Sequence, residues 1–325
     1  MRRRNFIQGI AAISVWPLAA RAQQSGAPVV GFLGSASASS FAPMVAAFQD
    51  GLNQLGYVDG RNVTVEYHWA EGNYDQLPWF ATDLVNRKVA AIVSAGAPAA
   101  LAAKNATTTI PIVFLSGVDP VRVGIIRTLN RPGSNITGIA ILTNGLIAKQ
   151  IELLHQVLPS ATLIAVLVNR ANPTHIQEIA DTRDSRAPLG IKTAILEASN
   201  MRDLNTAFAK ARELQAGALV VGTDAFFNSA RREIAALAMR SRLPTIHQLR
   251  EFVNAGGLMS YGAKLVDAYR LVGLYTGRVL RGEKPDDLPI QVLTKFELIF
   301  NLTTAKALGL EIPPTMLATA DAVIE

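Results

Sequence analysis

The sequence predicts an α/β protein made of two doubly wound lobes, in which helices cover both faces of a mostly parallel sheet. Short apolar segments alternate with longer segments whose apolar residues recur at helical spacing. Polar loops rich in Ser, Asn, Gly and Pro follow the apolar segments. The whole pattern then occurs a second time, about 130 residues further along the chain. We therefore expect two copies of one α/β unit.

The first unit contains segments that are too short for helices and rich in β-branched residues, as buried parallel strands are. These strands are expected at residues 29–33, 63–69, 89–93, 112–115 and 135–140. The helices between them are expected at residues 41–55, 74–87, 96–104 and 121–130. In the first helix Phe41, Phe48 and Leu52 share one face, and Pro43 lies in the first turn, where its missing N–H does no harm.

The helix at residues 121–130 is predicted from its apolar spacing and its flanking residues. Asp119-Pro120 ends the fourth strand, and Asp119 can cap a following helix. Val121, Ile125 and Leu129 then recur at helical spacing. Arg131-Pro132-Gly133 is typical of a helix end.

The second unit repeats the first in the same order. After an amphipathic helix at residues 147–157, strands are expected at residues 163–168, 191–196, 218–221 and 243–246. Leu189-Gly190-Ile191 matches Leu55-Gly56-Tyr57, and the helix start at Asn200 matches the one at Asn73. An ordered set of matches indicates an internal duplication.

Several segments near the carboxyl end lie outside the repeat. A short strand is expected at residues 258–261, a long helix at 264–280, an extended segment at 290–301 and a short helix at 303–308. A chain that crosses between two lobes more than once needs such segments.

The amino terminus is predicted to be an export signal and no part of the fold. Residues 2–7 are basic, residues 9–20 are apolar but shorter than the ~20 residues of a spanning helix, and Ala20-Arg21-Ala22 resembles a cleavage site. The spacing of Arg3, Arg4 and Phe6 resembles a twin-arginine signal, and an ordinary secretory signal is the alternative. Cleavage would leave Gln23 as the first residue.

Composition excludes several classes of function. The 325 residues include no cysteine, which excludes disulfides, thiolate metal sites and cysteine nucleophiles. Residues 1–22 hold four arginines and no acidic residue, so the formal net charge of +6 falls to +2 on cleavage. The basic balance therefore gives no reason to expect a nucleic-acid partner.

The candidate binding residues lie in the loops after the strands, because open α/β sheets bind ligands beyond the carboxyl ends of their strands. If the lobes face each other, these loops line one cleft. The helix starts there suit a carboxylate or phosphate, Asp224 or Asp119 suits an ammonium group, and aromatic rings suit an apolar part. The candidates are Ser35, Ser37, Ser40, Phe41, Gly96, Ala97, Asp119, Pro120, Thr143, Asn169, Asn172, Asp224, Phe226 and Tyr261.

Each candidate also has a structural alternative. Ser40, Asp119 and Asp224 precede helices, so the alternative for each is a helix cap with no contact to a ligand. Phe41 and Phe226 can be core residues, and Tyr261 can hydrogen-bond between the lobes instead of binding a ligand.

Sequence signatures of catalysis and of cofactor binding are missing. The chain contains no G-x-S-x-G, no P-loop and no G-x-G-x-x-G. Its four histidines have no spacing typical of metal ligands, so no metal and no cofactor are expected.

The chain resembles the solute-binding proteins of ABC transporters, in particular the group with tryptophan- and tyrosine-binding members. The resemblance covers residues 28–325. It is carried by VVGFLGS, LSGVDPVRVG, SNITG, GLMSYGAK and the closing TKFELIFNLTTAKALGLEIPP.

That resemblance implies the type I periplasmic-binding fold, with two Rossmann-like lobes joined by three hinge strands near residues 136–142, 260–262 and 286–292. Lobe one is then expected at residues 28–138 and 262–286, and lobe two at residues 139–261 and 287–325. The implied function is capture of a small solute by a periplasmic monomer that delivers it to a membrane permease. The family likeness suggests amino acids, aromatic ones among them, as the solute. An exported sensor that feeds a membrane receptor and an exported enzyme are the alternatives.

Overall fold

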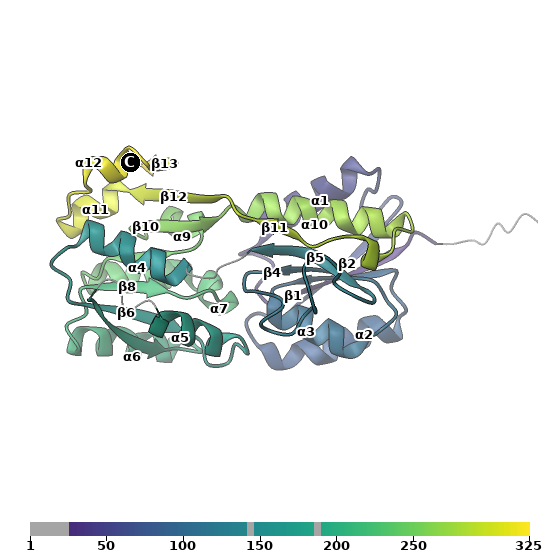
Figure 1. Cartoon of the computed structure of the whole chain (residues 1–325), viewed down its shortest axis with the longest axis horizontal. Coiled ribbons are helices and arrows are strands. Elements are labelled where there is room, and N and C mark those ends of the chain that lie inside the picture. Colours follow the sequence, from purple (N-terminus) through teal and green to yellow (C-terminus); the bar gives the residue numbers. More distant parts are fainter. Residues whose placement is uncertain (1–25, 142–145, 185–189) are drawn as a thin grey trace, which may run out of the picture.

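The computed structural model of the chain describes residues 26–141, 146–184 and 190–325. The predicted signal peptide at residues 1–22 and the candidate Thr143 lie outside the described residues. Figure 1 shows two lobes side by side, each a sheet with helices on both faces. The α/β class and the two sheets predicted from the sequence are confirmed.

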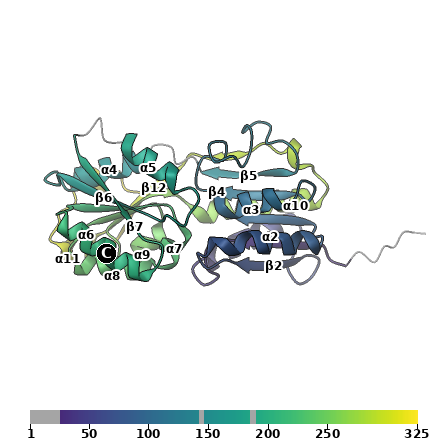
Figure 2. The same ribbon diagram turned by 90° about the horizontal axis from the view of Figure 1, so that it is seen from below.

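Lobe one is a parallel sheet with the strand order β11-β5-β4-β3-β1-β2. Its strands are β1 (Val29–Gly34), β2 (Thr64–Trp69), β3 (Ala91–Ala95), β4 (Ile112–Ser116), β5 (Ile136–Ile141) and β11 (Gln291–Leu293). Helices α1 (Ala42–Gln54) and α10 (Leu265–Leu280) cover one face, and α2 (Leu77–Asn86) and α3 (Ala97–Ala106) cover the other. A 3-10 helix, η1 (Tyr74–Gln76), precedes α2. Figure 2 shows α2 and α3 in front of this sheet.

Lobe two has the strand order β13-β12-β10-β9-β8-β6-β7, with β10 and β12 antiparallel. Its strands are β6 (Leu163–Val168), β7 (Lys192–Glu197), β8 (Ala218–Val221), β9 (Thr245–His247), β10 (Met259–Ala263), β12 (Phe296–Asn301) and β13 (Ala322–Ile324). Helices α4 (Leu146–Val157), α11 (Leu302–Leu308) and α12 (Pro314–Leu317) pack on one face together with part of α5 (His175–Asp184). Helices α6 (Met201–Glu213), α7 (Ala225–Ser229), α8 (Arg231–Arg240) and α9 (Arg250–Asn254) lie on the other side.

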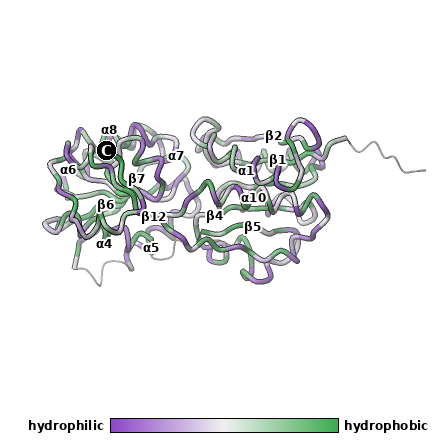
Figure 3. Tube along the Cα trace, turned by 90° about the horizontal axis from the view of Figure 1, so that it is seen from above, coloured by the Kyte–Doolittle hydropathy of each residue, from purple (hydrophilic) through white to green (hydrophobic). Residues whose placement is uncertain are grey.

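The central strands of both sheets are fully buried, as their unbroken apolar sequences predict. The strands β4, β5 and β8 are buried along their whole length. Figure 3 shows the apolar stretches running through the middle of each lobe. Polar side chains therefore lie at the strand ends, where the loops begin.

Close packing in lobe one depends on glycine at the α1–α10 contact. A Cβ on Gly51 would lie 2.1 Å from the backbone oxygen of Arg270, and a Cβ on Gly273 would lie 2.1 Å from that of Phe48. The two helices can therefore approach backbone to backbone, which fixes α10 on lobe one although it follows β10 of lobe two.

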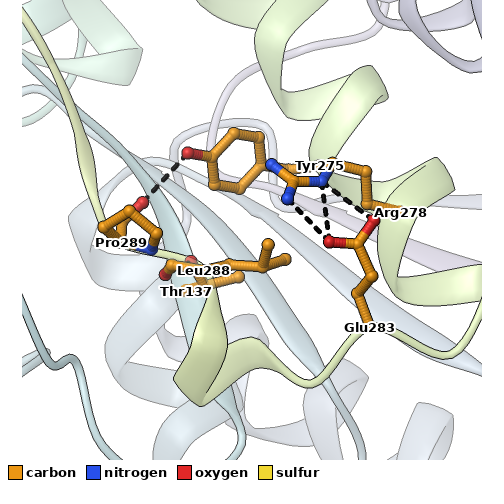
Figure 4. Close-up of polar contacts among 6 residues, drawn as sticks. All are labelled: Thr137, Tyr275, Arg278, Glu283, Leu288 and Pro289. Carbon is orange, nitrogen blue, oxygen red and sulfur yellow. Dashed lines mark hydrogen bonds and ion pairs between the residues drawn. The ribbon is translucent and has the colours of Figure 1, made fainter.

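The chain crosses between the lobes after Ile141, after Ala263 and between Leu293 and Phe296. The segment before the last crossing is tied to lobe one, because Thr137 Oγ1 donates to Leu288 O at 2.7 Å and Tyr275 Oη donates to Pro289 O at 2.9 Å (Figure 4). In the same region Arg278 forms a two-pronged ion pair with Glu283.

The predicted lobe boundaries differ from this arrangement at three places. Residues 262–263 were assigned to lobe one, but Gly262 and Ala263 pair with β12 in the sheet of lobe two. Residues 139–141 and 291–293 were assigned to lobe two, but β5 pairs with β4 and β11 pairs with β5 in the sheet of lobe one. Ile139 and Ile141 are buried in the lobe-one core. The repeat marks the ends of the duplicated units, whereas hydrogen bonding decides which sheet a connecting strand joins.

The predicted helix at residues 121–130 is wrong. This segment forms turns, in which the N–H groups of Ile125 and Ile126 both donate to Pro120 O, and Gly124 has φ +78°. The two isoleucines are buried in lobe one. The left-handed glycine ends the turn that Asp119 starts. Of the residues at helical spacing, Ile125 is buried and Leu129 packs against the core, but Val121 is exposed.

Smaller differences concern the carboxyl-terminal region. The strand predicted at residues 258–261 continues through Gly262 to Ala263, because it pairs with β12 along its whole length. The short elements α12 and β13 were not predicted.

Candidate functional site

A cavity lies between the lobes, at the carboxyl ends of the strands in both sheets. It contains about 740 Å³ of space that atoms do not fill, part of it open to solvent. Lobe one lines it with Ser35, Ala36, Phe41, Trp69, Tyr74, Ala95, Gly96, Ala97, Pro98, Leu115, Gly117, Val118, Ile141, Leu265 and Tyr269. Lobe two lines it with Asn172, Thr174, Thr223, Asp224, Ala225, Asn228 and Gln248. This is the position at which open α/β sheets bind small molecules.

Aromatic rings form the lobe-one wall of the cavity. The ring of Phe41 lies 6.5 Å from that of Trp69 and 6.0 Å from that of Tyr269, measured between centroids. Phe41 was predicted as a candidate, whereas Trp69 and Tyr269 were missed. Trp69 is the last residue of a predicted strand, so its place at the rim was available from the sequence. Tyr269 lies in the helix predicted at residues 264–280, outside the loops that follow the strands.

The start of α3 offers hydrogen-bond donors to the cavity. Gly96 is the N-cap residue, has φ 105° and gives the helix no side-chain cap. Ser35 lies beside it, since a Cβ on Gly96 would be 3.1 Å from Ser35 Oγ. Ser35 Oγ is buried and has no hydrogen-bond partner within the described residues. An uncapped helix start next to an unpartnered hydroxyl suits a carboxylate.

Asp224 is buried on the lobe-two wall and caps α7. Its Oδ1 accepts hydrogen bonds from the N–H of Phe226 at 2.8 Å and of Phe227 at 3.3 Å. Asn169 donates to the same oxygen at 3.0 Å, and Asn172 donates to Oδ2 at 3.0 Å. Tyr74 Oη of lobe one donates to Oδ2 at 2.5 Å. Capping, the structural alternative given for Asp224, is confirmed, and its carboxylate already has five donors.

Other candidate residues have structural partners around the cavity. Ser37 and Ser40 bond to each other and lie 3.3 and 3.4 Å from Ser229 Oγ of lobe two. Asp119 accepts from the N–H groups of Val121 and Arg122, so it caps a turn.

Phe226 and Tyr261 lie away from the cavity wall. Phe226 packs against Gly72 on the outer side of the lobe contact. Tyr261 stacks on Phe296 at 5.6 Å, and its carbonyl accepts from Gln150. Of the predicted candidates, the structure brings Ser35, Phe41, Gly96, Ala97, Asn172 and Asp224 together on the cavity wall.

Asn228 was not predicted and carries the other unpartnered polar atom of the cavity. It lies in α7, is 8% exposed, and its Oδ1 has no hydrogen-bond partner in the described part of the chain. The sequence signal that could have found it is its place four residues after Asp224, in the first turn and a half of the same short helix.

The charge of the cavity wall is negative. Asp224 is the charged side chain among the described lining residues, and no Lys, Arg or His is among them. A ligand carboxylate must therefore be held by N–H and hydroxyl groups, while a ligand ammonium group meets favourable potential near lobe two.

Two buried titratable groups lie behind the lobe-two wall. Glu178 Oε1 accepts from the N–H of Thr223, and burial, with the nearby charges of Asp224 and Asp181, raises the pKa of Glu178 to about 8. Burial lowers the pKa of His247 to about 3, so this imidazole stays neutral. Its Nδ1 accepts from the N–H of Leu249, which places the ring proton on Nε2.

The lobes touch on both sides of the cavity. Besides the Tyr74–Asp224 hydrogen bond and the serine contacts, Arg122 Nη1 lies 3.4 Å from Asp181 Oδ1. The structure therefore shows the two lobes closed on each other.

No group of three or more potential metal-binding side chains occurs in the described ranges. Among the described helices, none is long and apolar enough to cross a membrane.

Comparisons with known proteins agree with the fold. The family model for "ABC transporter substrate binding protein" matches residues 30–324. A tyrosine-binding protein of Clostridioides difficile (strain R20291) is 26% identical over 264 residues, which cover 81% of this chain and 76% of that protein.

Two solved structures have closely similar folds. A conserved domain protein from Vibrio cholerae O1 biovar El Tor has a TM-score of 0.84 and 27% identity, and the match covers 91% of this chain and 99% of that chain. An ABC domain from Streptococcus pneumonia in complex with L-Trp has a TM-score of 0.83 and 23% identity, with the same coverage. The chain has the type I periplasmic-binding fold expected from its sequence.

Proposed function

Because the chain belongs to the family of ABC transporter substrate-binding proteins, we propose that it captures a small solute outside the cytoplasm and delivers it to the permease of an ABC importer. The protein acts as a periplasmic monomer after removal of residues 1–22, and it binds its ligand without transforming it. The observation that carries this proposal is the cavity between the two lobes, which contact each other around it.

The ligand that fits this cavity best is an amino acid with an aromatic side chain. The wall of Phe41, Trp69 and Tyr269 suits a flat apolar group, because offset and edge-to-face ring contacts add to its burial. Two relatives support the assignment, one named for tyrosine and one solved with L-Trp.

The carboxylate and the ammonium group of the ligand contact different lobes. Its carboxylate docks at the start of α3, where Ser35 Oγ lacks a partner. Its ammonium group faces lobe two, where Asn228 Oδ1 lacks a partner and Asp224 supplies negative potential. Each buried unpartnered atom is then satisfied by the ligand, which gives specificity for a zwitterion.

Calorimetric titration with matched ligands tests this function. L-tryptophan and L-tyrosine should bind with micromolar Kd, about −8 kcal/mol. Tryptamine lacks the carboxylate and indole-3-propionate lacks the ammonium group, so each should bind at least about tenfold more weakly than L-tryptophan.

Ser35→Ala tests the contact to the ligand carboxylate separately from the contact to its ammonium group. It should raise the Kd of L-tryptophan about tenfold and leave the Kd of tryptamine unchanged. Ser94→Ala is the control, because Ser94 Oγ is also buried and unpartnered but does not line the cavity. If no aromatic amino acid binds, the ligand class is wrong, and native mass spectrometry of the purified protein would identify the ligand it retains.

A further inference from the structure

Tyr74 and Asp224 form a contact that the binding role of the cavity does not explain. Tyr74 precedes α2 in lobe one, and Asp224 begins α7 in lobe two. Both side chains are buried, with 8% and 2% of their surface exposed. The hydrogen bond between Tyr74 Oη and Asp224 Oδ2, at 2.5 Å, therefore joins the lobes inside the closed protein.

The carboxylate is held in place by its own lobe. Four of its five donors, the N–H groups of Phe226 and Phe227 and the amides of Asn169 and Asn172, belong to lobe two. These bonds do not depend on the position of lobe one. The tyrosine hydroxyl is the donor that arrives when the lobes close.

The chemistry of the pair suits a contact of this kind. Burial and the charge of Asp224 raise the pKa of Tyr74, so the hydroxyl remains a donor at any physiological pH. A neutral hydroxyl also costs less to desolvate when the lobes close than a Lys or Arg side chain would. A charge-assisted hydrogen bond is about twice as strong as a neutral one.

We propose that Tyr74 is a closure residue, whose hydroxyl latches lobe one to the Asp224 carboxylate of lobe two and stabilises the closed state whether or not a ligand is bound. The proposal rests on the lobe movement of the proposed function, but not on the identity of the ligand. It also explains why Asp224 is buried with a full set of donors: it is pre-arranged to receive Tyr74.

A disulfide trap in the ligand-free protein tests the latch. The chain contains no cysteine, so Ser37→Cys with Ser229→Cys introduces one pair, at a place where the two Oγ atoms lie 3.3 Å apart across the lobes. Disulfide formation needs the lobes to close, and its rate under mild oxidation reports the closed fraction.

Tyr74→Phe, added to this cysteine pair, keeps the ring and removes only the hydroxyl. Loss of the hydrogen bond between the lobes should lower the closed fraction and slow disulfide formation about tenfold. Tyr275→Phe is the matched control, since its hydroxyl bonds to Pro289 within lobe one (Figure 4). It should trap at the parent rate while lowering the melting temperature, whereas Tyr74→Phe should leave the melting temperature of the ligand-free protein unchanged.

Trapping of Tyr74→Phe at the parent rate would overturn the proposal, and so would slower trapping accompanied by a lower melting temperature, which would indicate damage within lobe one. Because no ligand is added, neither result depends on whether the protein binds aromatic amino acids.

Discussion

Asp224→Ala should lower the stability of the ligand-free protein as well as its affinity for ligand. From the sequence alone, Asp224 at the rim of lobe two suited a ligand ammonium group, with a helix cap as the alternative. In the structure the side chain caps α7 and receives the amides of Asn169 and Asn172. Its removal leaves these buried donors without an acceptor.

The size of the effect follows from these contacts. Loss of an N-cap side chain costs about 0.5–2 kcal/mol. An unsatisfied buried donor costs about 1–3 kcal/mol, and Asn172 keeps a long contact to Thr223 O at 3.5 Å. Together we expect the free energy of unfolding to fall by about 2–4 kcal/mol. Asp224→Asn keeps an oxygen for the helix N–H groups and should cost less.

Urea unfolding and calorimetric titration with L-tryptophan give the two measurements. Asn200→Ala is the control for capping alone, because Asn200 accepts from the N–H groups of Arg202 and Asp203 on the exposed start of α6. It should cost about 1 kcal/mol and leave affinity unchanged. If Asp224→Ala unfolds like the parent protein but loses ligand, the carboxylate serves the ligand and the five-donor account is refuted.

Two further predictions concern pH and export. Burial raises the folded-state pKa of Glu178 to about 8, above its unfolded value of 4.5. The contribution of Glu178 to stability is therefore fully present below pH 4.5 and is lost as pH rises through the folded pKa. The unfolding free energy of the parent protein should therefore fall relative to that of Glu178→Gln by about 1.4 kcal/mol per pH unit over this window. The control Glu213→Gln changes an exposed carboxylate, and its unfolding free energy should run parallel to that of the parent. Parallel curves for the parent and Glu178→Gln would show that the pKa of Glu178 is not perturbed. Amino-terminal sequencing of exported protein should find Gln23 first, and changing Arg3 and Arg4 to Lys should block export; efficient export of that variant would exclude the twin-arginine route.

Local patterns in the sequence were sufficient for most of the fold. Strands β6 and β8 occur at the residues predicted, because an apolar β-branched run between polar loops has few other ways to bury both faces. The same logic failed at residues 121–130, where the adjacent Ile125 and Ile126 anchor a turn in the core. Of the residues at helical spacing there, Ile125 is buried but Val121 is exposed, and the left-handed Gly124 ends the turn before a helix can form.

For the site, the sequence determined the edge of each sheet at which polar loops gather, and through it Ser35, Phe41, Gly96, Ala97, Asn172 and Asp224. Tertiary structure alone decided how these groups are used. Asp224 became a cap and a partner of Tyr74, a residue from the other lobe about 150 positions earlier in the chain. Trp69 and Tyr269 meet Phe41 across strands and a helix that are distant in sequence. A side chain's type sets which bonds it can make, but its partners depend on how two separately folded lobes close on each other, and no local pattern encodes that geometry.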